Sequence, residues 1–550
     1  MNESSSIDPR NLDGHLEVVQ PRARKPGNPQ ILRAQFDDGG LRPNGPLQSG
    51  SNVSSRGSTP VPPDAPPSVH ATSSARKQIR AEQKQRLFPT VEYAARVSHF
   101  DPKSDYRDFR GFFVLFWIGL AIMVISTMLR NLKETGYPLS IRQWGLFAEN
   151  FWELGLSDGA MVGSTALILP MHKMYSRNDG ILRWTKLGMA IQSIFQIFWL
   201  AFWVDWPFIR NWTWTAQVFF TLHLLAIFMK MHSYAFYNGH LSETRRRLND
   251  LDNPDSASKA AAYKYPRPKA HLQDSSQDDH VERERKNGEN LLKLREDLAY
   301  ELTSPLGRVS YPQNLTWGNY VDYIFCPTLC YELEYPRTAN TQWLELFYKT
   351  LAVFGCIFLM TIASEEFVIP VLDESAIRLQ SSRSISDFAL IMAETTSTLL
   401  FPFMVIFLLV FLVIFEYILG AFAEITKFAD RQFYADWWNS CDWLEFSREW
   451  NIPVHHFFRR HVYSASRGHL SRPVATVITF FISALAHELV MGCITKKLRG
   501  YGFFAMMLQM PIVMVQRSRF VRGRTLLNNV LFWCSMILGL SMMCALYVLV

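Results

Sequence analysis

Long runs of apolar residues constrain this chain more than any other feature of its sequence. Runs of about 20 apolar residues recur, the length that a helix needs to cross about 30 Å of hydrocarbon. Nine segments have this character: 111–130, 151–170, 184–204, 214–230, 348–369, 388–420, 473–494, 501–516 and 526–549. The sequence therefore predicts an all-α, polytopic transmembrane helical bundle of about nine helices. The sixth segment is over-long and contains Pro402, which predicts a tilted, kinked or broken helix.

Composition supports this fold class and excludes others. The 550 residues are 48% hydrophobic and 19% charged, and the apolar residues are gathered in blocks, unlike those of soluble domains. The seven cysteines have no metal-like spacing, so we expect free thiols, no bound metal and no disulfide framework. The net charge of +7 lies in the loops, where the positive-inside rule explains it. We expect no nucleic-acid partner.

The sequence divides into a tail, 1–105, and a span-bearing region, 106–550. Residues 1–74 are rich in Pro, Ser, Gly and Asn, which predicts disorder, and 75–110 turn basic and mildly amphipathic, as in a surface-lying or partner-binding helix. The first hundred residues hold no apolar run long enough for a secretory signal, which places the tail in the cytosol.

Loop charge predicts the topology. With a cytosolic N-terminus, the connectors 171–183, 231–347, 421–472 and 517–525 also face the cytosol, and they carry most of the loop Lys and Arg. The basic turn 495–500 is an exception. Residues 231–305 are charge-dense, which predicts a flexible cytosolic connector or a lone helix, whereas the aromatic, Pro-punctuated stretch 311–340 predicts ordered backbone along the membrane face.

Two histidines fall well inside the predicted spans, where an ionisable side chain is costly and is a functional candidate. His487 follows small residues and lies one helical turn after Ser483, so a ligand or another helix can approach it. A neutral imidazole bonded to a carbonyl across the bundle is the structural alternative. His223 has bulky neighbours, which favours an interhelical hydrogen bond, and His172 lies at a span edge.

The connector 421–472 contains two further motifs. The first is FYADWWN, with Phe433, Tyr434, Asp436, Trp437, Trp438 and Asn439 as candidate site residues. The second is WNIPVH, with Trp450, Asn451 and His455. Anchoring in the headgroup region would explain the aromatic run, and capping of a helix that starts near Pro453 would explain Asn451. A purely structural interpretation would need a separate explanation for each of these two motifs and for His487, so their occurrence in one chain favours a functional site.

Together these residues resemble the membrane-bound O-acyltransferases, in the branch of sterol and diacylglycerol O-acyltransferases. FYADWWN resembles the FYxDWWN signature of that branch, residues 450–455 its WNxxxH segment, and residues 484–488 its catalytic-histidine helix. Residues 327–332 (PTLCYE) and 335–338 (YPRT) are similar to another hallmark. The resemblance covers about residues 105–550 and implies an acyltransferase domain over 106–550. YPRT and the C-terminal segment resemble the fungal sterol enzymes, whereas PTLCYE is shared with diacylglycerol enzymes.

Acyl transfer from a thioester to an alcohol needs a base, an oxyanion donor and exclusion of water. His487 in hydrocarbon favours a neutral imidazole that can accept the proton, and the Asn451 amide can donate to the growing oxyanion. The resemblance assigns catalysis to the same two residues.

Acyl-CoA, the co-substrate, should enter from the cytosol past basic side chains at Arg459, Arg460 and Arg472. The resemblance implies that Trp450, His455, Tyr463 and Ser483 line its tunnel and that Arg472 lies near its phosphates. We also assign the six FYADWWN residues to acyl-CoA binding.

The expected function is therefore transfer of a long-chain acyl group from acyl-CoA to the 3-hydroxyl of a sterol that arrives from the bilayer. The resemblance implies an endoplasmic reticulum membrane protein in contact with lipids, without cofactor, that forms a homodimer or homotetramer. Three alternatives stay open. They are diacylglycerol as the acceptor, a covalent acyl-enzyme on Cys493 or Ser483, and a transporter or haem-binding protein in place of an enzyme.

Overall fold

The computed structural model describes residues 88–101, 104, 110–139, 145, 149–177, 180–252, 294–519, 521 and 523–550. Among these residues, β-type pairing is limited to three isolated bridges, between Arg96 and Asp430, Thr303 and Ser310, and Arg337 and Phe428. The described chain is thus all-helical, as the apolar runs predict.

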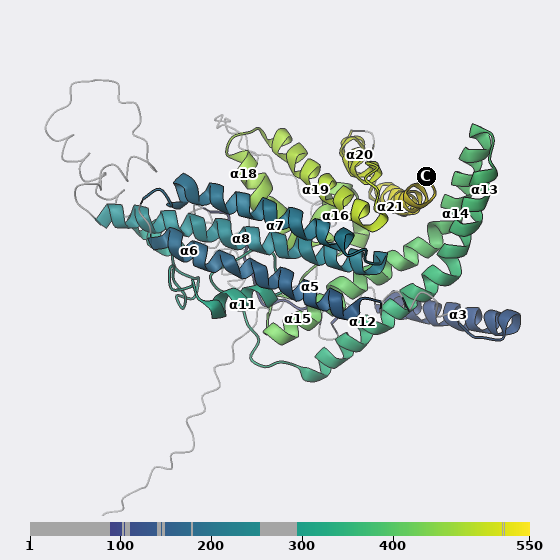
Figure 1. Cartoon of the computed structure of the whole chain (residues 1–550), viewed down its shortest axis with the longest axis horizontal. Helices are drawn as coiled ribbons and strands as arrows, with labels where there is room; N and C mark the ends of the chain where they lie inside the picture. The colour runs from purple at the N-terminus through teal and green to yellow at the C-terminus, as the bar shows by residue number, and fades with distance from the viewer. Residues whose placement is uncertain are drawn as a thin grey trace, which may run out of the picture. The chain divides into compact units, whose positions relative to one another are not determined.

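The helices follow one another along the chain (Figure 1). Those of the first half are α3 (Arg110–Thr135), α5 (Phe151–Ser164), η1 (Thr165–Leu167), α6 (Ile168–Arg177), η2 (Trp184–Gly188), α7 (Met189–Ile209), α8 (Trp214–Asp252) and α11 (Trp317–Phe325). Those of the next part are α12 (Trp343–Ala363), η3 (Ser364–Val368), α13 (Ile369–Ser381), α14 (Ile385–Phe411), η4 (Leu412–Ile418) and α15 (Leu419–Thr426). The last are η5 (Trp437–Asn439), α16 (Trp443–Glu449), α17 (Ile452–Phe457), η6 (Phe458–Tyr463), α18 (Ser464–Arg467), α19 (Arg472–Thr495), α20 (Tyr501–Gln516) and α21 (Thr525–Leu549).

Eight of these helical runs are long and apolar enough to cross a membrane. They are Arg110–Thr135, Phe151–Arg177, Trp184–Ile209, Trp214–Asp252, Trp343–Ser381, Ile385–Thr426, Arg472–Thr495 and Thr525–Leu549. The remaining predicted span is the apolar helix α20, which has only 16 residues. The described residues thus contain eight full-length spans and one short apolar helix, where the sequence predicts about nine spans.

Pro402 does not break the sixth span. Helices α14, η4 and α15 form one run of 42 residues with Pro402 inside α14. The irregularity lies further along, at the π-helical turns of η4. The span therefore extends beyond the predicted 388–420 at both ends, and the connector that follows it begins after Thr426.

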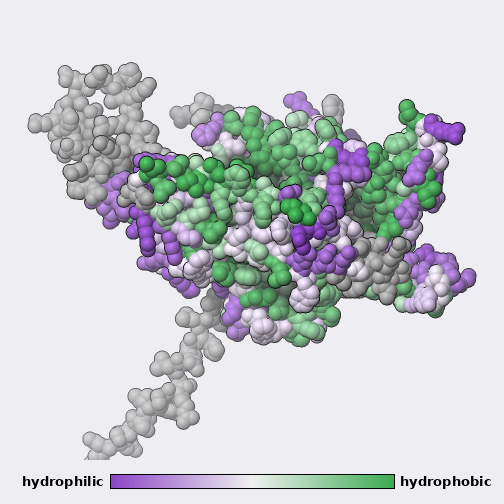
Figure 2. Space-filling view, viewed as in Figure 1, coloured by the Kyte–Doolittle hydropathy of each residue, from purple (hydrophilic) through white to green (hydrophobic). Residues whose placement is uncertain are grey.

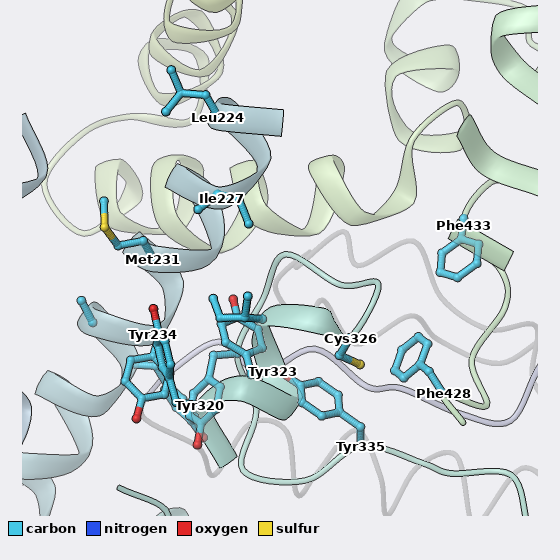
Figure 3. Packing of buried hydrophobic residues seen from close by; sticks show 14 of the residues in the cluster. Leu224, Ile227, Met231, Tyr234, Tyr320, Tyr323, Cys326, Tyr335, Phe428 and Phe433 are labelled. Atoms are coloured by element: carbon cyan, nitrogen blue, oxygen red, sulfur yellow. The ribbon is translucent and has the colours of Figure 1, made fainter. Parts of the chain in front are cut away.

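Helix α8 is the centre of the first group of spans, because α5, α6 and α7 all pack against it (Figure 1). Leu224, Ile227, Met231 and Tyr234 recur every three or four residues along one face of α8, and Figure 3 shows this row meeting tyrosines of α11. Buried aromatic rings continue this core toward Phe433. The core thus joins the spans to the motif-bearing loops.

A second group of spans carries the candidate base. Helix α19 packs against α20 and α8, while α14 packs against α21 and α13. Figure 2 shows hydrophobic side chains over much of the visible face. Many are large residues with exposed side chains on the spans, and α3 has the smallest buried share, 11%. In a lipid environment such surfaces face acyl chains.

Two predicted boundaries differ from the structure. The connector assigned to 231–305 starts instead as a continuation of α8 up to Asp252, because side chains such as Tyr237 and Leu241 are buried in the core. Residues 253–293 lie outside the described residues. Residues 88–101 were assigned to the tail, yet they pack on the helical region in extended form, because their backbone pairs with residues 429–431. Residues 1–87 lie outside the described part of the chain.

Candidate active site

The candidate base, His487, lies on the apolar spanning helix α19, 15 residues after Arg472 (487 − 472). At 1.5 Å per residue it is about 22 Å along the helix from its first residue. Its Nδ1 bonds the carbonyl oxygen of Ser483, one turn earlier, at 2.8 Å. That bond fixes the Nδ1–H tautomer, which leaves Nε2 unprotonated. The ring is exposed, and Nε2 has no hydrogen-bond partner among the described residues.

The carbonyl that His487 contacts lies on its own helix, not across the bundle as the structural alternative requires. The contact also bears on the acyl-enzyme alternative, because the histidine holds the carbonyl of Ser483 and not its hydroxyl. Cys493 is buried, on α19 beyond His487. The described geometry contains no nucleophile–base hydrogen bond at this site.

Glu488, next to the candidate base, fixes the position of α19. Its Oε1 accepts from the backbone N–H of Arg499 at 3.1 Å and of Gly500 at 2.7 Å. Its Oε2 accepts from Phe503 N at 3.1 Å and from the Tyr547 hydroxyl at 2.7 Å. One carboxylate thus binds the start of α20 and the end of α21, where the helix N-terminus favours negative charge. The residue types alone did not reveal this role.

Asn451 is the N-cap of α17. Its Oδ1 accepts from Val454 N at 3.1 Å, which confirms the capping explanation for this residue. The same bond orients the amide, so that Nδ2 is free to donate and has no partner among the described residues. Capping and oxyanion binding are therefore compatible, since they use different atoms.

The FYADWWN and WNIPVH segments pair with each other. Ile452 N donates to Phe433 O at 3.0 Å, and Ala435 N donates to Glu449 O at 2.8 Å. The Trp450 ring stacks on the Phe407 ring of α14, with 4.6 Å between the ring centroids. It also meets the Trp437 ring edge to face, with 4.8 Å between the centroids. Aromatic packing between the two motifs and a spanning helix therefore holds the backbone at Asn451.

The residues of FYADWWN differ in exposure. Phe433, Tyr434 and Trp437 are buried, and the Tyr434 hydroxyl donates to Glu416 Oε2 at 3.0 Å. Burial and the nearby Glu416 raise the pKa of Tyr434 well above its ordinary value, so the phenol stays a donor. The other three lie nearer the surface, and Asn439 is exposed. The backbone carbonyl of Asp436 accepts from Asn439 N at 2.9 Å, and the backbone carbonyl of Trp438 accepts from the side chains of Asn529 and Trp533.

The PTLCYE segment is held by a buried lysine. Lys230 of α8 donates to three carbonyls, those of Tyr323 at 3.0 Å and of Cys326 and Thr328 at 2.6 Å each. Burial raises the pKa of the Cys330 thiol to about 12. All seven cysteines are free. A lysine at the end of an apolar run is a detectable signal in the sequence, although the prediction above considered only the histidines of the spans.

The predicted basic surface is only partly present. Arg459 and Arg472 are exposed, but Arg460 is 3% exposed and pairs with Glu332 of PTLCYE at 3.1 Å. The prediction that Arg460 faces acyl-CoA is therefore wrong, because its side chain, on the π-helical turn η6, lies in the core. Tyr463 ends that turn and is half-buried.

His455 is half-buried one turn into α17. Burial, and then the charges of Arg459 and Arg448, lower its pKa to about 4, so its imidazole is neutral at physiological pH.

The two other histidines that the sequence singled out, His223 and His172, have structural surroundings. His223 Nδ1 bonds Asp158 of α5 at 2.6 Å, which confirms the predicted interhelical hydrogen bond. His172 is buried among Tyr175, Trp184 and Tyr234. Among the described residues, no cluster of three or more His, Cys, Asp or Glu could hold a metal ion.

The structure thus gathers the predicted residues into two sets. One contains FYADWWN with Trp450 and Asn451, joined by backbone bonds and stacked rings. The other contains Arg472, Ser483 and His487, which share α19. Helix η6, which follows α17 directly, packs against α19 and connects the sets. No hydrogen bond joins Asn451 to His487 within the described region.

A polytopic bundle that carries an exposed histidine on an apolar span and an amide-bearing aromatic loop is typical of an enzyme acting on membrane-borne substrates. Residues 184–549 match the membrane-bound O-acyltransferase family, and the chain belongs to it.

Several curated proteins are similar over most of the chain. "Probable sterol O-acyltransferase 2" of Schizosaccharomyces pombe is 41% identical over 445 residues, which cover 80% of this chain and 87% of that protein. "Sterol O-acyltransferase 2" of Candida albicans is 33% identical over 490 residues, 84% of this chain and 78% of that protein. "Diacylglycerol O-acyltransferase 1" of Dictyostelium discoideum is 33% identical over 256 residues, 46% of this chain and 40% of that protein.

Proposed function

We propose that this chain is a sterol O-acyltransferase, which transfers a long-chain acyl group from acyl-CoA to the 3-hydroxyl of a sterol. The similarity to fungal sterol O-acyltransferases over 80% or more of the chain supports the substrate class. The observation that carries the chemistry is the Nδ1 contact of His487 with the Ser483 carbonyl, which leaves Nε2 as an acceptor on an apolar helix.

The proposed reaction is a direct transfer. Nε2 of His487 takes the proton of the sterol hydroxyl while the oxygen attacks the thioester carbonyl carbon. Nδ2 of Asn451 donates to the oxyanion of the tetrahedral intermediate. The carbon–sulfur bond then breaks, and the leaving thiolate takes the proton from the imidazolium. The products are a steryl ester and CoA with a free thiol.

We assign the acyl-CoA site to residues of both sets together with His455 and Tyr463. Phe433, Tyr434, Asp436, Trp437, Trp438, Asn439, Trp450, His455, Tyr463 and Ser483 line the acyl and pantetheine path, and Arg472 meets the phosphates. The exposed guanidinium at the first residue of α19 supports the last assignment, because it marks the helix end remote from His487. We further infer residence in the endoplasmic reticulum membrane with a cytosolic N-terminus, contact with bilayer lipids, and a homodimer or homotetramer.

Diacylglycerol is the second candidate acceptor, and the match to the Dictyostelium protein favours it over other alcohols. A sterol is rigid and has a single hydroxyl, so it needs a narrow apolar slot. The aromatic and methionine side chains of α20 and α21 would wall such a slot, which supports the sterol.

The test uses membranes from cells that lack endogenous sterol and diacylglycerol acyltransferases and that express the full chain. Labelled acyl-CoA is offered with sterol or with diacylglycerol, each at saturation. We expect steryl ester as the main product. A His487→Ala variant should lose the product by at least about a hundredfold, since a positioned base contributes about that much or more, and Asn451→Ala should lose about a hundredfold.

A matched control is His223→Asn, which changes another histidine within a span but keeps a hydrogen-bonding group opposite Asp158. It should retain most activity. Faster formation of triacylglycerol than of steryl ester would overturn the sterol assignment. Near-wild-type turnover by His487→Ala at equal protein level would overturn the assignment of the base.

A further inference from the structure

We call residues 327–332 (PTLCYE) and 433–439 (FYADWWN) the hallmark loops. An extended segment, residues 88–98, crosses the helical region in contact with both of them, and we call this segment the strap. Its backbone forms a parallel bridge just before FYADWWN: Arg96 N donates to Ala429 O at 3.1 Å, and Arg431 N donates to Arg96 O at 2.9 Å. The chain enters FYADWWN two residues later, at Phe433. The position of the strap therefore fixes the backbone from which that motif starts.

An ion pair reinforces the bridge. Arg96 Nε lies 3.0 Å from Asp430 Oδ1, and its Nη2 lies 2.5 Å from Oδ2. This is a two-point contact of the kind that fixes orientation as well as distance. The side chain of Asp430 is 4% exposed and accepts a third bond, from Ala94 N at 3.1 Å. Removal of the Arg96 side chain would therefore leave the buried carboxylate of Asp430 without its paired positive charge.

Ser98 extends the strap to the motif itself. Its hydroxyl hydrogen-bonds with Glu416 of η4 and lies 2.8 Å from the Tyr434 hydroxyl, while Tyr434 also donates to Glu416. The three side chains form a closed, buried triangle between the strap, FYADWWN and the sixth span. Lys349 of α12 lies 3.3 Å from the same carboxylate and balances its charge.

The other end of the strap contacts the PTLCYE segment. Val91 N donates to Glu332 Oε1 at 2.9 Å, and the Tyr93 hydroxyl bonds Thr328. The Phe88 ring lies under the guanidinium of Arg460, 4.7 Å from its centroid. A single extended stretch therefore contacts both PTLCYE and FYADWWN, through the backbone N–H of Val91 and through the side chains of Tyr93 and Ser98.

We propose that the strap is a positioning element for acyl transfer, and that Arg96 and Ser98 are positioning residues that hold FYADWWN in its working geometry. The inference rests on the proposed function, because it assumes that this motif serves acyl-CoA. Displacement by about 1 Å of a group that positions a substrate can cost up to about a hundredfold in rate. Loosening of the strap should therefore lower the rate of acyl transfer, although neither Arg96 nor Ser98 touches the reacting atoms.

The first experiment compares Arg96→Ala and Ser98→Ala with the wild type in the full chain. We expect kcat/KM for acyl-CoA to fall by roughly tenfold to a hundredfold with little change in KM for the sterol. Hydrogen exchange should rise in residues 428–439 and stay unchanged in α19. The matched control is Arg295→Ala, which removes an arginine from an exposed pair with Asp252. It should change neither quantity.

The second experiment restores the contact by another bond. Paired backbones at a bridge are about 4.8 Å apart, within the range that a disulfide spans. A variant with both Arg96→Cys and Asp430→Cys should be slow when reduced. It should regain most of its rate, and its protection at 428–439, when oxidised. Each single substitution, oxidised in the same way, is the control and should stay slow.

Loss of general folding would lower the rate without recovery on oxidation, and that result would overturn the proposal. Wild-type kinetics and wild-type exchange in Arg96→Ala and Ser98→Ala would overturn it as well. The exchange readout needs no turnover, so it tests the strap even if the wild type esterifies neither acceptor. In that case the proposed function fails, and the rise in exchange at 428–439 alone decides on the strap.

Discussion

Replacement of Arg460 by methionine should destabilise the protein far more than a surface substitution does. The side chain of Arg460 is 2% exposed and that of Glu332 is 9% exposed, with nitrogen and oxygen 3.1 Å apart. Arg460 also donates to the Tyr331 carbonyl at 2.9 Å and lies 4.5 Å from the Tyr237 ring. Burial opposes its charge, but Glu332 and Cys330 outweigh it and raise the pKa of Arg460.

The magnitude follows from what each substitution leaves behind. Arg460→Met leaves the carboxylate of Glu332 without its cation, and Glu332→Gln leaves a buried guanidinium without its anion. Removing one partner of a buried pair costs about 3–5 kcal/mol. The double variant leaves neither charge unpaired, so it should cost less than either single variant.

Thermal unfolding of the detergent-solubilised protein, followed by tryptophan fluorescence, is the assay. The midpoints should fall in the order wild type, double variant, single variants. The same comparison on the exposed pair Arg295–Asp252 should give differences near zero, since surface pairs contribute about 0–1 kcal/mol. A double variant that melts below both single variants would refute the reasoning. So would an Arg460→Met variant of normal stability with a raised KM for acyl-CoA, because it would return Arg460 to the substrate surface.

Two further outcomes are expected. Because burial lowers the pKa of His455 from 6.5 to about 4, the unfolded chain binds a proton at this residue more readily than the folded chain. The contribution of His455 to stability should therefore be full above about pH 6.5 and decrease as the pH falls toward 4. In the His455→Gln variant the melting midpoint should depend less on pH across that range, and an unchanged pH dependence would contradict the assignment. Gly239→Ala should destabilise by about 1–3 kcal/mol, because its Cβ would lie 2.1 Å from the Trp184 side chain, whereas Gly159→Ala, with no atom within 4 Å, should have little effect in the same melting assay.

The positions of the spans were predictable because hydropathy reports directly on contact with lipid. Their ends were less so, since α8 continues for 22 residues beyond residue 230 (252 − 230), as a helix whose polar residues are buried by other parts of the chain. The polar residues Asn238 and Ser242 predict a loop by their hydropathy, although both side chains are buried. Only tertiary packing distinguishes such a helix from a flexible connector.

The candidate site was predictable where a residue type is chemically distinctive. His487 and Asn451 stood out because imidazole and amide groups in apolar or aromatic surroundings are uncommon. The strap did not, because it contains no long apolar run and its contacts come from residues more than 200 positions away, as for Val91 and Glu332. Long-range hydrogen bonds to single side chains leave no periodic pattern in a sequence.

Backbone irregularities mark the places where the two hallmark loops are held. The π-helical turns of η4 contain Glu416, which bonds Tyr434 of FYADWWN, and those of η6 contain Arg460, which pairs with Glu332 of PTLCYE. A π-helical turn shifts the facing of the residues that follow, so a charged side chain can be directed inward from a run whose neighbours face elsewhere. Successive helical residues also point about 100° apart, so Arg459 is exposed while Arg460 is buried, and a pair of adjacent arginines does not reveal in sequence which of them faces inward. Each inward charge binds a hallmark loop and also a neighbouring span: Glu416 pairs with Lys349 of α12, and Arg460 lies over the Tyr237 ring of α8. The two distorted helices therefore connect the hallmark loops to the spans around them.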